Sequence, residues 1–169
     1  MSEIVAKLTH SQTRAKDFYR FHLFRKSPIK YIYYGISSLV IILAVIFYFL
    51  MKYELALFLV FISIMILIIR VVNTNITINK IIKDLRFPSI NYTLKFNSQS
   101  VIYQYDNFKK EYLWDNIIVI CEVNNYLYFY ITPSSALILT KYTISEEERI
   151  LLQSLITNAK VKHYQYKFK

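Results

Sequence analysis

The chain has 169 residues, a formal net charge of +10 and a hydrophobic fraction of 55%, a combination typical of membrane proteins with cationic flanks. It contains one glycine, Gly35. Phosphate-binding loops, dinucleotide fingerprints and the nucleophile elbow of hydrolases need several glycines close together, so the sequence excludes their standard forms. The histidines and Cys121 lack the spacing of metal ligands. We therefore expect no enzyme activity, no cofactor and no metal.

Residues 1–30 are polar and basic, and we expect them to lie in the cytoplasm as a strand followed by a helix. Ile4 to Leu8 alternate loosely, which favours a short strand, and Thr9 with Gln12 matches a capping box that opens a helix through about Lys26. One interpretation places this helix on anionic lipids of the inner leaflet. The other packs it on the cytoplasmic domain, with its cations only setting the topology. The cations concerned are Arg20, Arg25, Lys26 and Lys30.

Two apolar segments predict a transmembrane hairpin over residues 31–72. Residues 31–51 carry no charge and are long enough to cross about 30 Å of hydrocarbon. Residues 53–72 form a second span if Arg70, near its end, reaches the membrane surface. Basic residues crowd before and after the hairpin but not in its turn, so the positive-inside rule places both termini in the cytoplasm of a multi-pass protein.

Small side chains on the two predicted spans favour close helix packing. They are Gly35 and Ser38 on the first span and Ser63 on the second, and small residues let membrane helices approach each other closely. Two helices are too few to enclose a transport path without oligomerisation, so we expect binding rather than transport. A homo-oligomer is compatible with this pattern.

A polar connector over residues 73–89 leads to a segment of alternating pattern. Short runs rich in Ile, Val, Tyr and Phe are separated by turn residues, which is typical of antiparallel strands. Ser145 with Glu148 then forms a capping box that opens a helix, and Trp114 is expected to anchor the packing. Residues 90–160 thus predict a pleckstrin-homology (PH)-like antiparallel β-barrel closed by a C-terminal helix. The whole chain is predicted to be an α+β membrane protein.

Residues 161–169 form a basic, aromatic tail. Its cations and tyrosines, taken with the preceding lysine, are Lys160, Lys162, Tyr164, Tyr166 and Lys167. Such a pattern suits either single-stranded nucleic acid or a lipid surface, and a tether at the inner leaflet favours anionic lipid over nucleic acid. A merely solvated tail is the other interpretation.

Several motifs carry a resemblance to a known family across nearly the whole chain. They are Leu8-Thr9, Phe21-His22, Tyr92 to Phe96, Trp114 to Ile117, Tyr126 to Tyr130 and Leu139 to Tyr142. With these motifs the chain resembles the YcxB-like family of bacterial membrane proteins. The resemblance implies a short N-terminal region, a two-helix hairpin and a PH-like cytoplasmic domain.

The sequence and the resemblance together suggest a non-enzymatic binding protein of the bacterial inner membrane. By analogy with two-helix proteins that carry related PH domains, the first hypothesis is immunity against a membrane-active bacteriocin or toxin. The alternative is a structural or regulatory membrane subunit whose PH-like domain recruits a protein partner or senses anionic lipid. The expected partners are therefore the bilayer, a peptide or protein toxin, or a second copy of the chain.

Overall fold

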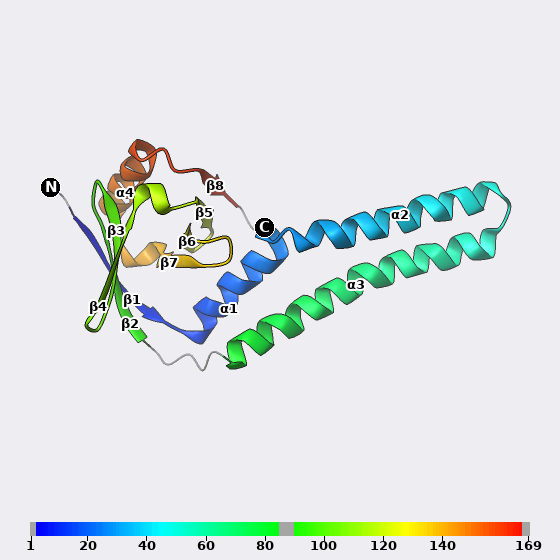
Figure 1. Ribbon diagram of the computed structural model, residues 1–169, viewed down its shortest axis with the longest axis horizontal. Helices are drawn as coiled ribbons and strands as arrows, with labels where there is room; N and C mark the ends of the chain where they lie inside the picture. The colour runs from blue at the N-terminus through cyan, green and yellow to red at the C-terminus, as the bar shows by residue number, and fades with distance from the viewer. Residues whose placement is uncertain (1–2, 85–89, 167–169) are drawn as a thin grey trace. The chain divides into compact units, whose positions relative to one another are not determined.

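A computed structural model of the protein describes residues 3–84 and 90–166. The chain divides into two compact units (Figure 1). Residues 1–14 and 87–169 form a β-rich unit, and residues 15–86 form a helical unit. The five residues 85–89 of the predicted connector lie outside the described residues, as does Lys167 of the predicted tail.

Sheet A of the β-rich unit joins the beginning of the chain to its middle. It contains β1 (Ile4–His10), β2 (Ile90–Phe96), β3 (Ser100–Tyr105) and β4 (Phe108–Leu113), antiparallel and in that order. β1 pairs along its whole length with β2, from Ile4 opposite Phe96 to His10 opposite Ile90. The strand predicted near the N-terminus is confirmed, and it belongs to the β-rich unit.

Sheet B contains the remaining strands of the unit. They are β5 (Val119–Val123), β6 (Tyr126–Tyr130), β7 (Ala136–Thr140) and β8 (His163–Gln165). The order is β7-β6-β5-β8, and β8 runs parallel to β5. Between β7 and β8 lie the short 3-10 helix η3 (Lys141–Thr143) and α4 (Glu146–Asn158). α4 begins with the predicted capping box, in which Glu148 N donates to Ser145 Oγ and Ser145 N donates to Glu148 Oε2.

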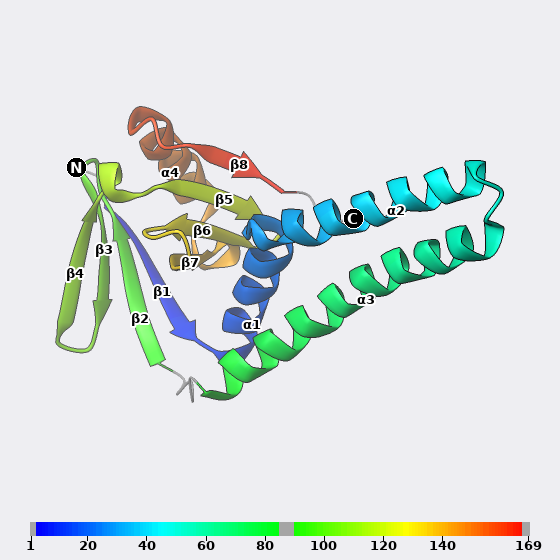
Figure 2. The same ribbon diagram turned by 45° about the vertical axis from the view of Figure 1, so that its right-hand side comes forward.

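The two sheets and α4 share one hydrophobic core, but the sheets do not close into the predicted barrel. Among the described strands, none of β1–β4 pairs with any of β5–β8, and Figure 2 shows them as separate sheets. The prediction treated the strands as one continuous meander. The 3-10 turn η2 (Trp114–Asn116) interrupts it, because Trp114 turns into the core and ends β4 before β5 begins.

Trp114 anchors this core at the junction of the two sheets. Its Nε1–H donates to the carbonyl of Asn97 over 2.9 Å, so its one polar group is satisfied. Its ring centroid lies 6.4 Å from that of Phe96 and 6.4 Å from that of Phe129. The aromatic cluster of Phe96, Trp114 and Phe129 therefore ties β2, η2 and β6 together.

The helical unit contains most of α1 (Gln12–Phe21), whose first three residues belong to the β-rich unit. It also contains the π-helical turn η1 (His22–Lys26), α2 (Ile29–Phe49) and α3 (Tyr53–Asp84). α2 and α3 form a hairpin (Figure 1), and both are long and apolar enough to cross a membrane. In their short turn, Met51 has a φ of 59°. This is the left-handed region that glycine tolerates and methionine does not favour.

α3 is longer than the sequence predicted. The second span was expected to end at residue 72, with a connector after it, but the helix continues to Asp84. Ile78 and Ile82 are buried on this extension, and their spacing of four residues places them on one helix face. That apolar face gives residues 73–84 a reason to stay helical despite their polar composition.

Candidate functional sites

The surface of the α2–α3 hairpin is apolar on nearly every side. In the most apolar 18-residue window of each helix, 11% of α2 and 17% of α3 is buried. A core helix of a water-soluble protein would be mostly buried. Most of the large apolar side chains of both helices, from Ile29 to Ile76, are instead exposed.

A pair of serines fixes the contact between the two helices. Ser37 Oγ lies 2.6 Å from Ser63 Oγ, and both side chains are buried. Ala44 and Ala56 are also buried. These small side chains allow the close approach that membrane helices use for packing.

Of the three small residues expected at this contact, one lies there. Ser63 is in the interface, whereas Ser38 is exposed and donates to the carbonyl of Gly35 in its own helix. Gly35 is also exposed, and nothing lies within 4 Å of the position that a Cβ would take. The expected role of Gly35 and Ser38 is corrected to Ser37, because a helix turns by about 100° per residue and neighbours face different directions.

Ser37→Ala and Ser63→Ala are each expected to destabilise the hairpin, and the double variant should lose less stability than the sum of the two single variants. A double-mutant cycle should give a coupling of about 0.6 to 1.7 kcal/mol, the range for hydrogen bonds between membrane helices. The measurement is unfolding of the full chain in mixed micelles, followed by circular dichroism. Ser38→Ala is the matched control and should not couple to Ser63→Ala. Equal coupling of Ser37 and Ser38 to Ser63 would contradict the assignment.

Arg70 is a buried cation near the end of the apolar part of α3. It is 8% exposed. Its Nη1 donates to Tyr34 Oη over 2.6 Å, and its Nη2 donates to the carbonyl of Phe24 over 3.3 Å. The guanidinium carbon also lies 4.7 Å from the ring centroid of Tyr34 and 6.0 Å from that of Phe24, within the range of cation–π attraction. Arg70 thus ties α3 to η1 and α2 instead of extending away from the protein.

The π-helical turn η1 explains why Phe24 offers a carbonyl to Arg70. Ser27 N donates to the carbonyl of His22, five residues back, over 2.7 Å. The last carbonyls of a helix lack partners in their own helix and carry the negative end of its dipole. Arg70 neutralises part of that end, and Lys30 Nζ donates to the neighbouring carbonyl of Arg25.

Four further cations were predicted near the Arg70 end of the hairpin, and they lie close to η1 in the sequence. Arg20 and Arg25 are exposed, while Lys26 and Lys30 are half-buried. Sequence reasoning singled out all five cations but missed Phe24 and Tyr34, the residues that hold Arg70. Their separations of 46 and 36 residues from Arg70 leave no local signal for the contact.

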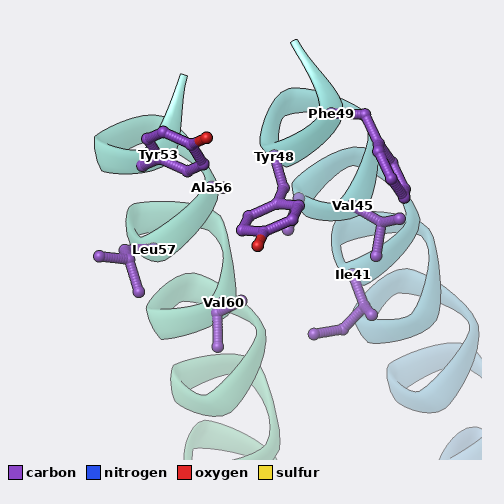
Figure 3. A pocket seen from close by; sticks show the side chains of 9 residues that line it. Ile41, Val45, Tyr48, Phe49, Tyr53, Ala56, Leu57 and Val60 are labelled. Carbon is purple, nitrogen blue, oxygen red and sulfur yellow. The ribbon is translucent and has the colours of Figure 1, made fainter. Parts of the chain in front are cut away.

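The opposite end of the hairpin holds an apolar groove of about 450 Å³. It lies between α2 and α3 beside their turn, and Figure 3 shows the ring of Tyr48 in the space between the two helices. Ala44 and Ala56 leave room there because their side chains are short. The groove therefore begins where the helices are joined and continues toward Ile41 and Val60.

In the β-rich unit, Glu122 on β5 lies at the centre of a polar cluster with Lys141, His163 and Gln165, here called the Glu122 cluster. Lys141 Nζ lies 2.7 Å from Glu122 Oε1, and Gln165 Nε2 donates to Glu122 Oε2 over 3.1 Å. His163 Nε2 lies 3.1 Å from Glu122 Oε2 without a hydrogen bond between them, and the imidazole forms an ion pair there only in its protonated form.

The Glu122 cluster holds β8 onto sheet B. The backbone contributes as well, since Tyr166 N donates to the carbonyl of Glu122 over 2.7 Å and Ile120 N donates to that of Lys162 over 2.8 Å. Residues His163–Gln165 of the predicted tail are therefore a strand, which the sequence did not predict, while lipid binding by the tail's cations stays a prediction. Lys160, Lys162 and Tyr164 remain exposed on its surface.

The charge of Glu122 is stabilised by its neighbours. Burial by itself would raise the pKa of its carboxyl group, but the Lys141 ammonium, His163 and the Gln165 amide outweigh burial and hold the pKa below its usual range. Because the pKa is lower in the folded chain, this stabilisation is present above the ordinary carboxyl pKa. It is lost as the pH falls through the lowered value.

Glu122→Gln is expected to loosen β8 at neutral pH. The amide protons of Tyr166 and Ile120 should exchange about fivefold faster, because a partly exposed ion pair contributes on the order of 1 kcal/mol. In the unmodified chain the same faster exchange should begin only below about pH 4.5. Rates at different pH values are compared after correction for the intrinsic exchange rate. Hydrogen exchange of the full chain measures both. Glu147→Gln, at an exposed position of α4, is the control, and equal acceleration by both variants would contradict a specific role of Glu122.

Comparison with known proteins adds no relative. No family model, no curated protein and no solved structure matches the chain. The similarity to the YcxB-like family therefore stays a prediction, and function has to be argued from the chain's own residues.

Proposed function

We propose that this chain is a non-enzymatic binding protein anchored by its α2–α3 hairpin in the bacterial cytoplasmic membrane. One observation carries the proposal, namely the exposure of most large apolar side chains on both helices. Burying one such side chain stabilises a protein by about 1.5 to 3 kcal/mol relative to leaving it in water. A hairpin with this surface is far more stable in hydrocarbon than in water.

The charges support an orientation with both termini in the cytoplasm. The turn between the helices carries Lys52, next to Glu54 at the start of α3. The other end of the hairpin carries Arg25, Lys26 and Lys30, with Lys80 and Lys83 at the end of α3. Short loops rich in Lys and Arg stay on the cytoplasmic side.

Cysteine labelling tests both the insertion and the orientation. Lys52→Cys should react with a membrane-impermeant maleimide in intact cells, whereas Asn79→Cys, exposed on the last part of α3, should react only after permeabilisation. The native Cys121 is buried and serves as the unlabelled background. Labelling of both positions in intact cells, or the reverse pattern, would refute the proposed orientation.

A second candidate function is protection against a membrane-active toxin, and the groove beside the turn favours it. In the proposed orientation this groove opens within the outer leaflet, where an apolar peptide from outside arrives first. Tyr48 and Tyr53 line it, and aromatic side chains carry much of the energy of apolar recognition.

Survival of a toxin-sensitive strain tests this candidate. Expression of the chain should raise survival in the presence of a membrane-active peptide encoded near its gene. Val60→Trp, which fills the groove, should remove the protection, while Val71→Trp, exposed outside the groove, should keep it. Unchanged sensitivity across a panel of membrane-active peptides would exclude the candidate.

A further inference from the structure

Arg70 carries a full positive charge, and no carboxylate of the described residues is paired with it. In residues 3–84 and 90–166, no carboxylate lies within ion-pair distance of its guanidinium. Among these residues, its guanidinium contacts a hydroxyl, a carbonyl and two ring faces. These take two of the five N–H groups that a guanidinium offers. A shielded cation without a counter-ion is costly in a medium of low dielectric.

The depth of Arg70 in the hairpin places it at a lipid headgroup rather than at the centre of the bilayer. Arg70 lies 17 residues after Tyr53, the first residue of α3, which is about 26 Å along the helix. The hydrocarbon of a bilayer is about 30 Å thick. With the turn at one surface, Arg70 therefore reaches the edge of the hydrocarbon at the other, where phospholipid phosphates lie.

The same end of the hairpin is strongly cationic. From Phe18 to Tyr53 the sequence contains no acidic residue, and Leu55 to Lys83 contains none either. Lys26 is the last residue of η1, to which Arg70 is bonded, and Lys30 follows four residues later. Each cation near an anionic membrane surface strengthens binding about fivefold.

We propose that Arg70, together with Lys26 and Lys30, binds the phosphate group of an anionic phospholipid at the cytoplasmic end of the hairpin. The inference rests on the proposed membrane anchoring. A guanidinium pairs with a phosphate through two parallel hydrogen bonds, and the phosphate supplies the negative charge that the described residues do not. Tyr34 and Phe24 hold the guanidinium in place, so little rotamer entropy is lost on binding.

The test compares the full chain in lipid nanodiscs of phosphatidylcholine alone and of phosphatidylcholine with phosphatidylglycerol. Native mass spectrometry gives the retained phosphatidylglycerol, and thermal unfolding gives the stabilisation by each lipid. Arg70→Gln should lower the apparent affinity for phosphatidylglycerol about fivefold or more. Lys52→Gln removes the same charge at the opposite end of the hairpin and should leave the affinity unchanged.

Two further variants separate lipid binding from a purely structural role. Tyr34→Phe removes the hydroxyl that accepts from Arg70 but keeps the cation, so it should lower stability in both lipids and retain the preference for phosphatidylglycerol. Arg70→Lys keeps the charge without the two parallel hydrogen bonds and should bind with intermediate affinity. It also replaces Arg70→Gln if that variant does not fold.

Several outcomes would overturn the site. Arg70→Gln could destabilise the chain equally in both lipids while keeping the preference for phosphatidylglycerol. Lys52→Gln could weaken binding as much as Arg70→Gln, which would indicate a diffuse surface charge. Inorganic phosphate added to phosphatidylcholine discs could stabilise the chain as much as phosphatidylglycerol, which would indicate a free-anion site. Failure of the chain to enter any disc would refute the membrane anchoring instead.

Discussion

Leu39→Asp is expected to prevent stable membrane insertion of the hairpin. Leu39 lies near the middle of α2 and is 63% exposed, so in a bilayer it contacts hydrocarbon. A carboxylate at the centre of a membrane helix costs about 3 kcal/mol on the insertion scale. After an alkaline carbonate wash, the ratio of membrane-bound to released chain should therefore fall about a hundredfold.

Ile76→Asp is the matched control for this prediction. Ile76 is 59% exposed on the same hairpin, but it lies 23 residues into α3, about 35 Å from the turn and beyond the hydrocarbon. The substitution should leave the membrane-bound fraction almost unchanged. If both variants stayed membrane-bound, or if both were released, the exposed apolar surface would not mark a membrane span.

Phe129→Ala is expected to destabilise the β-rich unit by about 3 to 5 kcal/mol, the range for large core side chains replaced by alanine. Phe129 is 0% exposed, and its ring centroid lies 5.3 Å from that of Phe96. The substitution leaves a cavity at the junction of sheets A and B. This loss is comparable to the whole stability of many domains.

The single tryptophan of the chain provides the measurement. Trp114 belongs to the same aromatic cluster, so its fluorescence reports unfolding of the β-rich unit even when the hairpin stays in a micelle. The denaturant midpoint of the full chain should fall strongly for Phe129→Ala. Phe108→Ala, on β4 and 55% exposed, should leave the midpoint nearly unchanged. Equal shifts would show that the cluster is not the centre of the core.

Local patterns carried the predictions that were confirmed. An uncharged run of helical length indicates α2, and alternation between turn residues indicates the strands of the β-rich unit. The capping box of Ser145 and Glu148 correctly gave the start of α4. Each of these signals is contained within a few residues, so no knowledge of distant partners is needed.

The features that the sequence could not give depend on distant partners or on the rotation of a helix. Choosing Ser37 over Ser38 requires the face of α2 that meets α3, and both are small polar residues with the same propensity. The end of α3 depends on burial of Ile78 and Ile82. The division into two sheets depends on Trp114 turning inward, and the parallel pairing of β8 depends on Glu122, which in isolation resembles any solvated carboxylate.

The left-handed backbone at Met51 bears on how the hairpin comes to be formed. A methionine in this region is less stable by about 1 to 2 kcal/mol than in a right-handed helix, so the turn opposes the reversal of the chain instead of driving it. Contacts between α2 and α3 hold the hairpin closed, namely the pair of Ser37 and Ser63 and the buried Ala44 and Ala56. Under the proposed membrane anchoring, we expect assembly in two stages, in which each helix is stable across the bilayer before the two associate, and the loop only keeps the two segments within reach of each other.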